Sequence, residues 1–445
     1  MNRYHARWVV PVTAPPIADG TVVEHDGRIT FVGRRVDAPP GADHDLGNVV
    51  LVPGLVNTHA HLDLSVMRGF LEDLTFPEWI RTLTRARRAV LDPDALLDSA
   101  RLSLVEAVRA GITTVAETSA SGVAMAAFRE AGVRGITYQE VFGPDPGQCD
   151  DAVRDLRGHV DRLRALETPL ARLGISPHAP YSVSDRLFAA SARLALDERL
   201  PMAIHIAESA DEERYVATAT GDFADSQRDR GFDMRPRGRS PVAMLHAAGA
   251  LAPGPLLIHC VRVDAGDIAL IAAAGCTVAH CPAANAKLGH GIAPLSELLG
   301  AGITVGLGSD SVAGNNRMDL LEEARLAALL QRARSGDPLR ISAAEALELA
   351  TIGGARALGL ESEIGSLEPG KAADLAAFSL EAVPATPTTD PITALIFSLS
   401  ARDAVLTMVA GEPRMIEGRV LAEPAGLRDR VQRAAERLAG WRVAN

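Results

Sequence analysis

Two histidines stand one residue apart, His59 and His61, directly after the apolar run at residues 51–56. Residues two apart on a strand point to the same face, so one strand end can offer two imidazoles to one metal ion. The alternative is a hydrogen-bonded pair that merely ends a strand, because a chain with 12 histidines can contain such a pair by chance. Ligands at other strand ends are needed to decide between the two.

Ionisable residues also end several other apolar segments along the chain. They are His178, His205, Glu208, His259, His280 and Asp310. A third imidazole from His205 and a carboxylate from Asp310 would complete a nitrogen-rich site that suits Zn2+ or Fe2+ and leaves one position for water. Four ligands that are far apart in the sequence but meet in the fold are much stronger evidence than one pair.

Glu208 lies three residues beyond His205, near the loop end of its strand. A bound metal lowers the pKa of its water toward about 7, and a nearby carboxylate can pass the released proton to a leaving group. The alternative for Glu208 is a solvated loop carboxylate. His259 could be another ligand, a satisfied core histidine, or a neutral donor that orients the attacking water. We favour the last of these.

Short apolar strands alternate with amphipathic helices through the middle of the chain. Eight strand candidates occur: PGLVNTH (53–59), GITTVAE (111–117), GITYQEV (135–141), LGISPH (173–178), MAIHIAE (202–208), PLLIHCV (255–261), CTVAHCP (276–282) and ITVGLGSD (303–310). One intervening helix has Asp92 as its N-cap, Pro93 at its first position and Gly111 at its end. The pattern predicts an α/β fold, a (β/α)8 TIM barrel over residues 53–359, with its active site at the carboxyl ends of the strands.

Both ends of the chain contain short strands separated by Gly and Pro turns. Residues 1–52 and 360–423 are expected to share one small β-sandwich domain, and residues 424–445 to form a C-terminal surface helix. Residues 209–241 form a long insertion after the fifth strand, predicted as either a lid or a mobile excursion.

The composition fits a globular protein with a large core, since 47% of the 445 residues are hydrophobic. A formal net charge of -11 argues against nucleic acid and anionic membranes as partners, so a small molecule is expected. No secretory signal or membrane-spanning stretch is recognised, which predicts a soluble cytoplasmic enzyme, with a homodimer as the one assembly considered. Four cysteines without a CxxC pair predict free thiols.

Seven segments resemble the motif series of the amidohydrolase superfamily, in its deaminase and chlorohydrolase branch with one metal. They are VPGLVNTHAHL, SPHAPY, HIAES, IHCV, CPAANAKLGHGIAP, GLGSDS and EPGKAADL. The resemblance implies one divalent ion, Zn2+ or Fe2+, with the ligands His59, His61, His205 and Asp310. It further implies that Glu208 is the proton shuttle and that His259 lies beside the reactive water. His178 replaces the bridging lysine or glutamate of two-metal relatives, so it is expected to bind substrate instead.

The same resemblance implies hydrolytic deamination of an aromatic ring. Asp310 would also accept a proton from the attacking water, while Glu208 protonates a ring nitrogen and ammonia leaves. Two rivals remain. The same activated water could displace chloride or open an amide, or the barrel could serve only as a binding or scaffold protein. The presence of all four ligands and Glu208 argues against the scaffold.

The segment MRGFLEDLTFPEWI (67–80) resembles the loop that covers the ribose in adenosine-type deaminases, which implies Glu72 and Trp79 as substrate contacts. Trp79 could equally be a core anchor. S-adenosylhomocysteine deaminases have an acidic residue where this chain has Pro77, and they have an arginine at about the position of Gln139. We still expect Gln139 to contact the substrate. Both departures weaken that assignment.

HLDLS, FPEW, EVFGPDP, SPHAPYSVS and GRSPVAML resemble aminodeoxyfutalosine deaminases more closely, with Asp63 in place of their usual glutamate. The main predicted reaction is therefore aminodeoxyfutalosine to futalosine plus ammonia, a step of menaquinone biosynthesis. The alternatives are deaminases of S-adenosylhomocysteine, 5'-methylthioadenosine, adenosine, guanine or cytosine, or a chlorohydrolase.

Three further expectations follow from the resemblance. His280 and Asn285 match a loop that lines the pocket, while Lys287 and His290 are expected to hold that loop. An arginine between residues 228 and 239 could pair with the substrate's carboxylate, unless that loop is simply solvated.

Overall fold

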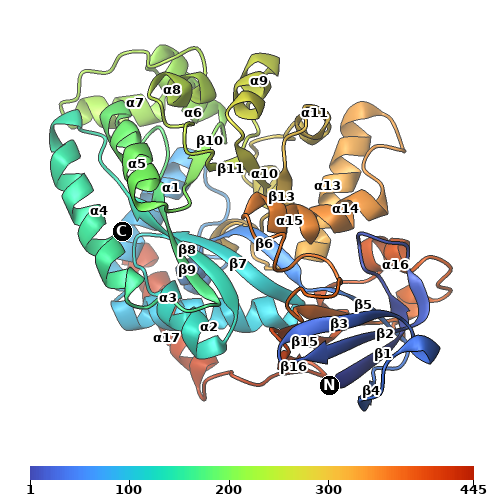
Figure 1. Cartoon of the computed structure of the whole chain (residues 1–445). Coiled ribbons are helices and arrows are strands. Elements are labelled where there is room, and N and C mark those ends of the chain that lie inside the picture. The colour runs from blue at the N-terminus through green and yellow to red at the C-terminus, as the bar shows by residue number, and fades with distance from the viewer. Residues whose placement is uncertain (445) are drawn as a thin grey trace.

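The barrel is built from two four-stranded parallel sheets in the computed structural model, which describes residues 1–444 (Figure 1). The first sheet contains β6 (Leu55–Ala60), β7 (Ile112–Ser119), β8 (Arg134–Val141) and β9 (Ala171–Pro177), in that order. The second contains β10 (Ala203–Ile206), β11 (Leu256–His259), β12 (Thr277–His280) and β13 (Val305–Leu307). All eight predicted strands are present, each within a few residues of its expected bounds.

The two sheets meet at both seams. Ala60 forms a parallel bridge with Asp310, and Ile175 forms one with Met202. The first seam is reinforced by the Asp310 amide, which donates to the His59 carbonyl at 2.9 Å. The predicted α/β barrel is therefore confirmed, and its closure joins the first strand to the segment that carries Asp310.

Helices surround the barrel strands, whose side chains are almost all buried. They are α1 (Phe76–Val90), α2 (Pro93–Arg109), α3 (Ala124–Ala131), α4 (Cys149–Arg164), α5 (Asp185–Glu198), α6 (Ala210–Thr218), α7 (Asp222–Asp229), α8 (Pro241–Ala247), α9 (Ala265–Ala273), α10 (Pro282–Lys287), α11 (Leu295–Gly300), α12 (Val312–Asn315), α13 (Leu320–Ser335), α14 (Ala343–Leu349) and α15 (Ile352–Ala357). As predicted, the Asp92 carboxylate accepts from the Ala95 amide at 2.8 Å and begins α2.

Both ends of the chain contribute to one small domain, which lies at the lower right of Figure 1. Its strands are β1 (Asn2–Val9), β2 (Ile17–His25), β3 (Arg28–Arg34), β4 (Ala42–Asp45), β5 (Val49–Pro53), β14 (Leu375–Ser379), β15 (Ala404–Val409), β16 (Glu412–Ile416) and β17 (Arg419–Val420). They form one continuous nine-stranded sheet, in which β5 pairs with β1 on one side and β14 on the other. The predicted sandwich is thus a single hydrogen-bonded sheet, whose two ends share one apolar cluster.

The small sheet passes directly into the barrel at Gly54, between β5 and β6. A Cβ at this position would lie 2.1 Å from the Thr113 hydroxyl oxygen, which only glycine avoids. The strand that carries the histidine pair is therefore fixed at its start by close backbone packing.

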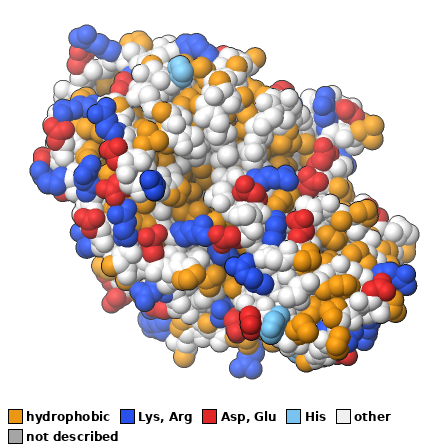
Figure 2. All heavy atoms as spheres, in the orientation of Figure 1, with side chains coloured by type: hydrophobic (Ala, Val, Ile, Leu, Met, Phe, Trp, Pro, Cys, Tyr) orange, Lys and Arg blue, Asp and Glu red, His pale blue; other side chains and the backbone are white. Residues whose placement is uncertain are grey.

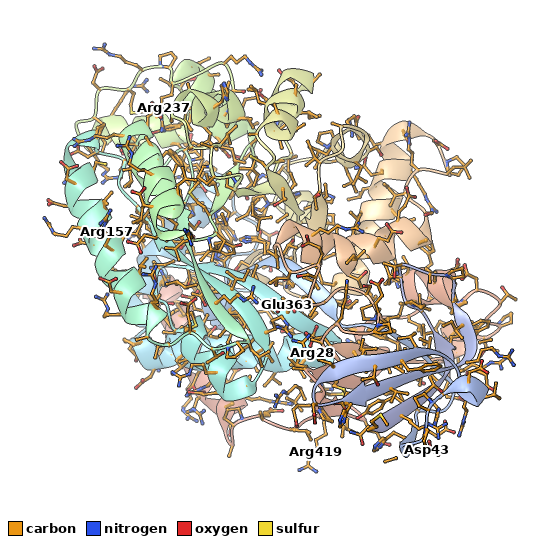
Figure 3. All side chains as sticks on the ribbon, in the orientation of Figure 1. Arg28, Asp43, Arg157, Arg237, Glu363 and Arg419 are labelled. Carbon is orange, nitrogen blue, oxygen red and sulfur yellow. The ribbon has the colours of Figure 1, made fainter. Side chains whose placement is uncertain are left out.

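A buried ion pair joins the barrel to the small domain. The Arg134 guanidinium, on β8, donates to both carboxylate oxygens of Asp374 at 3.0 and 3.2 Å. Both side chains are almost completely buried. Glu363, labelled in Figure 3, lies 3.4 Å from Arg134 but is about one-third exposed, with a side-chain exposure of 36%.

Replacing Asp374 by Asn is expected to lower the free energy of unfolding by about 3–5 kcal/mol, because it leaves the Arg134 charge buried without its partner. Chemical denaturation of the purified protein measures this. The matched variant Glu363→Gln removes a partner that is about one-third exposed and is expected to cost less than about 1 kcal/mol. Equal losses for the two variants would contradict the difference in burial.

The insertion at residues 209–241 contains α6 and α7 and is attached to the barrel. The Arg237 guanidinium, labelled in Figure 3, donates from Nε to the Asp185 carboxylate at 2.9 Å and from Nη2 to the Val183 carbonyl at 2.9 Å. Ser209 caps α6 by accepting from the Glu212 amide. Between the two predicted alternatives, these contacts favour a fixed cover over an excursion.

Two further helices complete the chain, α16 (Pro391–Phe397) and α17 (Leu427–Ala444). The predicted C-terminal helix is α17, which buries Leu427, Val431, Ala434 and Leu438 and packs on α2. All four cysteines are buried free thiols, as predicted.

The outer surface mixes both signs of charge. Figure 2 shows Lys and Arg interspersed with Asp and Glu over the side of α4, and hydrophobic side chains gathered toward the small domain. Within residues 1–444, no helix combines the length and apolar character needed to cross a bilayer.

Candidate active site

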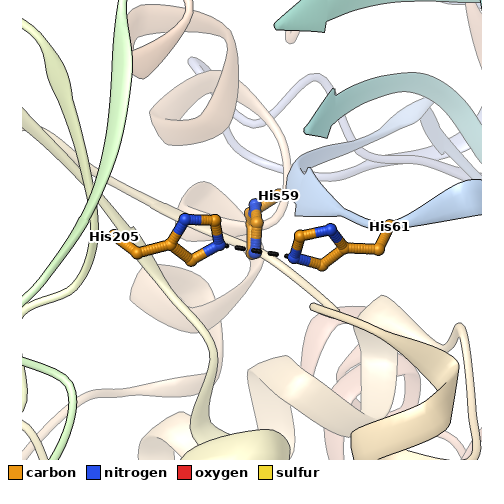
Figure 4. A group of neighbouring side chains, drawn as sticks. All are labelled: His59, His61 and His205. Atoms are coloured by element: carbon orange, nitrogen blue, oxygen red, sulfur yellow. Dashed lines mark hydrogen bonds between the residues drawn. The ribbon is translucent and has the colours of Figure 1, made fainter. Parts of the chain in front are cut away.

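Three imidazoles converge at the carboxyl ends of β6 and β10. Figure 4 shows His61 and His205 facing each other from opposite sides, with His59 between them. The Nε2 atoms of His61 and His205 are 3.3 Å apart. One ligand atom from each of the three histidines lies within 4.8 Å of the others. The predicted pair is therefore part of a cluster rather than an isolated strand end.

Asp310 joins this cluster from the segment that follows β13. Its Oδ1 atom lies 3.2 Å from His59 Nε2 and 3.6 Å from His61 Nε2. A four-coordinate ion with bonds of about 2.0–2.1 Å to nitrogen and oxygen has ligand atoms roughly 3.3 Å apart. The donor types and these separations fit one divalent ion that the four predicted residues would hold, with a further coordination position left for water.

Neighbouring polar groups fix the orientation of these ligands. His205 Nδ1 donates to the His178 carbonyl at 3.2 Å, so the lone pair of Nε2 faces the cluster. His59 Nδ1 lies 3.4 Å from the Thr118 hydroxyl. Burial lowers the pKa of His59 to about 4 and that of His205 well below its usual value, which keeps both rings neutral, as metal binding requires.

The backbone turns sharply where these strands end. Ala207, His259 and Asp310 have φ angles of 52°, 78° and 57°, in the left-handed region that residues other than glycine seldom adopt. Such conformations cost on the order of 1–3 kcal/mol each and persist where the surrounding structure enforces them. Here they aim the side chains of His259 and Asp310 toward the cluster.

Glu208 lies beside the cluster with two histidines as partners. Its Oε1 atom is 3.6 Å from His259 Nε2 and 3.2 Å from His290 Nε2. Burial raises the pKa of this carboxyl, but His259 and the hydrogen bond from His290 outweigh it and hold the pKa below its usual value. Glu208 is therefore ionised near neutral pH and can accept a proton. His290, expected only to hold its loop, contacts this residue directly.

His259 is oriented by Asn285. The Asn285 carboxamide oxygen accepts from His259 Nδ1 at 3.0 Å, so a neutral His259 presents the lone pair of Nε2 to the cavity. We predicted a neutral donor at this position. The hydrogen bond from Nδ1 leaves Nε2 of His259 facing the cavity, where it accepts from water when the ring is neutral and donates when the ring is protonated.

A cavity of about 920 Å³ opens from the cluster. Its walls come mainly from α1, the ends of β8 and β9, and the insertion, and they include the predicted contacts Trp79 and His178. Tyr181 and Phe223 stack face to face at 4.2 Å and add an aromatic wall. The volume suits a nucleoside-sized ligand with a substituent.

Three predicted substrate contacts lie elsewhere. Glu72 is bound by Lys287 and Asn316, each at 2.8 Å, and is not among the residues that line the cavity. Gln139 donates to the backbone carbonyls of Ala120 and Glu140 on the opposite face of β8. His280 is buried behind the cavity wall, and burial lowers its pKa to about 3. Asn285 acts on the cavity only through His259.

Four residues that line or border the cavity were not predicted as contacts. Glu140 and Tyr181 line it directly, and so do Asp63 and Arg87, which form an ion pair at 2.8 Å. Asp63 also accepts from the Ser121 hydroxyl at 2.6 Å. Strand alternation was the available signal for Glu140, since a residue next to one facing away must face inward.

Comparisons with known proteins give one consistent group. A family model described as "Amidohydrolase family" matches residues 50–414. A 5-methylthioadenosine/S-adenosylhomocysteine deaminase of Moorella thermoacetica is 32% identical over 93% of both chains. An adenosine deaminase from Xanthomonas campestris, solved with bound zinc, superposes with a TM-score of 0.88 at 29% identity, covering 99% of this chain and 98% of that one. Atrazine chlorohydrolase from Arthrobacter aurescens, complexed with zinc, gives 0.83 at 26% identity, covering 98% of this chain and 100% of that one.

Proposed function

The chain belongs to the amidohydrolase family and is a metal-dependent hydrolytic deaminase, and from this premise we propose that it is a zinc enzyme that deaminates adenine nucleosides at the 6-amino group. The observation that carries the proposal is the cluster of His59, His61 and His205, with Asp310 against two of these imidazoles, at the end of a nucleoside-sized cavity and with Glu208 beside it. The product would be the corresponding 6-oxo nucleoside and ammonia.

A divalent ion bound by the four ligands would supply an activated water, with its pKa lowered toward about 7. Three residues around the ion would have separate roles. Glu208 takes one proton of the attacking water and moves it to ring nitrogen N1 of the purine, which makes the neighbouring carbon electrophilic. Asp310 accepts the second proton of the water and passes it to the departing amino group, which leaves as ammonia. His259 holds the attacking oxygen in place through Nε2.

His178 is suited to hold the purine ring. Burial lowers its pKa to about 3, so the ring is neutral, and its Nδ1 atom lies 2.7 Å from the Ser182 hydroxyl. The Ser182 hydroxyl donates to the Ala179 carbonyl at 3.1 Å, so it accepts from His178 Nδ1 and leaves the Nε2 lone pair facing the cavity, where it can accept from a donor on the substrate. The Tyr181 and Phe223 rings offer stacking surfaces for the flat base.

The outer part of the cavity is basic. Arg81, Arg85, Arg88 and Arg230 all line it. Arg81 lies 3.9 Å from the Asp222 carboxylate, and Arg85 stacks on Trp441. Within the described chain, neither Arg88 nor Arg230 forms an ion pair with a carboxylate. Arg230 donates to the Gln227 carboxamide oxygen at 3.3 Å and stacks on Phe232. The basic lining favours a nucleoside whose 5' substituent carries a carboxylate.

Two candidate substrates carry such a carboxylate. The curated relatives favour S-adenosylhomocysteine, which was our alternative, over the main prediction. Aminodeoxyfutalosine keeps its support from the motif resemblance and from Pro77, in the first turn of α1, where the resemblance implies an acidic residue in S-adenosylhomocysteine deaminases. Both carry a carboxylate at the far end of the 5' substituent, whereas 5'-methylthioadenosine does not.

The zinc-loaded enzyme is expected to release ammonia from S-adenosylhomocysteine or aminodeoxyfutalosine with a kcat/KM at least about tenfold above that for adenosine or 5'-methylthioadenosine, because one charge-assisted hydrogen bond contributes roughly 1.5–3 kcal/mol. A coupled ammonia assay over these four nucleosides, with guanine, cytosine and a chloro-triazine as comparisons, measures it. Arg88→Ala should lower kcat/KM only for the two substrates that carry a carboxylate. Failure on every adenine nucleoside would refute the proposed substrate class and leave the metal site standing.

A further inference from the structure

Glu140 is a buried carboxylate in the cavity wall that the proposed reaction does not use. It is the penultimate residue of β8, where strand alternation turns Gln139 outward and Glu140 toward the cavity. Its side chain is 7% exposed, and its Oε1 atom has no hydrogen-bond partner among residues 1–444. The histidine nitrogen nearest to it is His178 Nε2, at 4.0 Å. A buried acceptor left without a donor is costly unless a ligand supplies one.

The neighbouring side chains do not donate a hydrogen bond to Glu140 Oε1. Arg87, the closest cation on α1, gives its Nη2 donor to Asp63, and the Ser121 hydroxyl donates to the same Asp63 oxygen. The Arg87 Nε donor is itself buried without a partner. Burial raises the pKa of Glu140 to about 7, partly offset by His61 and Arg87. The wall therefore presents an unfilled acceptor and an unfilled donor, which together complement a hydroxyl group.

Chemistry restricts which part of an adenine nucleoside can meet Glu140. The purine carries one donor group, the 6-amino group, and this group must lie at the metal for the reaction to occur. Its remaining ring nitrogens are acceptors. Within the base and ribose that all these substrates share, the ribose hydroxyls are then the donors left to satisfy a carboxylate beside His178.

Resting on the proposed function, we propose that Glu140 is a substrate-binding residue that accepts a hydrogen bond from a ribose hydroxyl and makes the enzyme select ribonucleosides. The Arg87 guanidinium supplies the complementary donor to the same sugar edge. Glu140 thus binds the sugar, while Glu208 carries the proton for the base.

The test combines hydroxyl deletion with substitution of Glu140. For the zinc-loaded wild type, kcat/KM with 2'-deoxyadenosine or 3'-deoxyadenosine is expected to fall roughly 10- to 100-fold below that with adenosine. In Glu140→Ala, adenosine should fall by a similar factor, and the deoxynucleosides should fall no further. Glu140→Gln, which keeps the volume and an acceptor oxygen, should recover part of the discrimination.

Control measurements separate this inference from the proposed function. Glu130→Ala removes a carboxylate from the end of α3, paired there with Arg101, and should keep the wild-type preference. Melting temperature and zinc content identify any variant that fails to fold. If the wild type is inactive on all adenine nucleosides, the proposed function fails. If it is active but indifferent to hydroxyl deletion, or if Glu140→Ala keeps the discrimination, Glu140 does not bind the sugar.

Discussion

Replacing Glu208 by Gln is expected to lower kcat/KM for deamination by about 100- to 10,000-fold while zinc stays bound. Gln matches Glu in shape but cannot carry a proton from the attacking water to the ring nitrogen. Glu208 is also outside the four-ligand cluster, so the ion should be retained. Steady-state ammonia release and metal analysis of the same preparation give the two quantities.

The matched control is Glu213→Gln. This glutamate lies on α6, is nearly half exposed, and pairs with Arg262 at 3.0 Å on the surface. Its substitution should leave both activity and zinc unchanged. Full activity of Glu208→Gln with zinc bound would remove Glu208 from the proton path. Loss of zinc in that variant would instead show that its role is structural.

Replacing His61 by Ala is expected to reduce bound zinc from about one ion per chain to nearly none and to abolish detectable deamination. Three remaining ligands cannot hold the ion with the affinity of four, and metal-activated water supplies the nucleophile. His61 is the best choice of ligand because its side chain is 13% exposed, while His59 is fully buried and more important for packing. Elemental analysis and ammonia release measure the result.

Chelation of the wild-type enzyme should reproduce this loss, and added zinc should reverse it. The variant cannot be rescued in the same way, which separates a missing ligand from an adventitious inhibitor. His246→Ala, at an exposed histidine of α8, is the matched control and should behave as wild type. Retained activity in a zinc-free preparation would overturn the metal-dependent mechanism.

Much of the site could be predicted because its signals are local. Apolar strands that end in His59, His205, His259 and Asp310 are visible along the chain, and parallel strands must bring those ends to one rim. Burial and ligand spacing then agree with the prediction. The chemistry of the reactive centre is therefore encoded at strand ends.

The substrate contacts were harder to predict because they depend on register and on loops. On β8 the expected contact, Gln139, is one residue from Glu140, and a shift of one residue moves a side chain to the opposite face. Glu72 faces Lys287 because two loops from distant parts of the chain meet. Similarly, no local pattern brings His290 to Glu208.

The strand order of the small sheet could not be predicted from the sequence either. Turn signals identify its strands, but pairing of β5 with β14 joins segments from opposite ends of the chain. Such pairings are set by packing and chain topology rather than by neighbouring residues. The sequence therefore predicted a composite domain without its single-sheet connectivity.

That composite sheet has a consequence for biosynthesis. While the chain is being made, β5 has β1 beside it, but its other edge stays open until β14 has been synthesised. Contacts between such distant segments slow folding, and an open strand edge invites wrong pairing. Because β5 continues through Gly54 into the strand that carries His59 and His61, the nascent chain completes the support of its metal site late. Ribosome-bound chains that stop before β14 should therefore depend on chaperones, whereas the finished protein protects that edge with its own C-terminal strands.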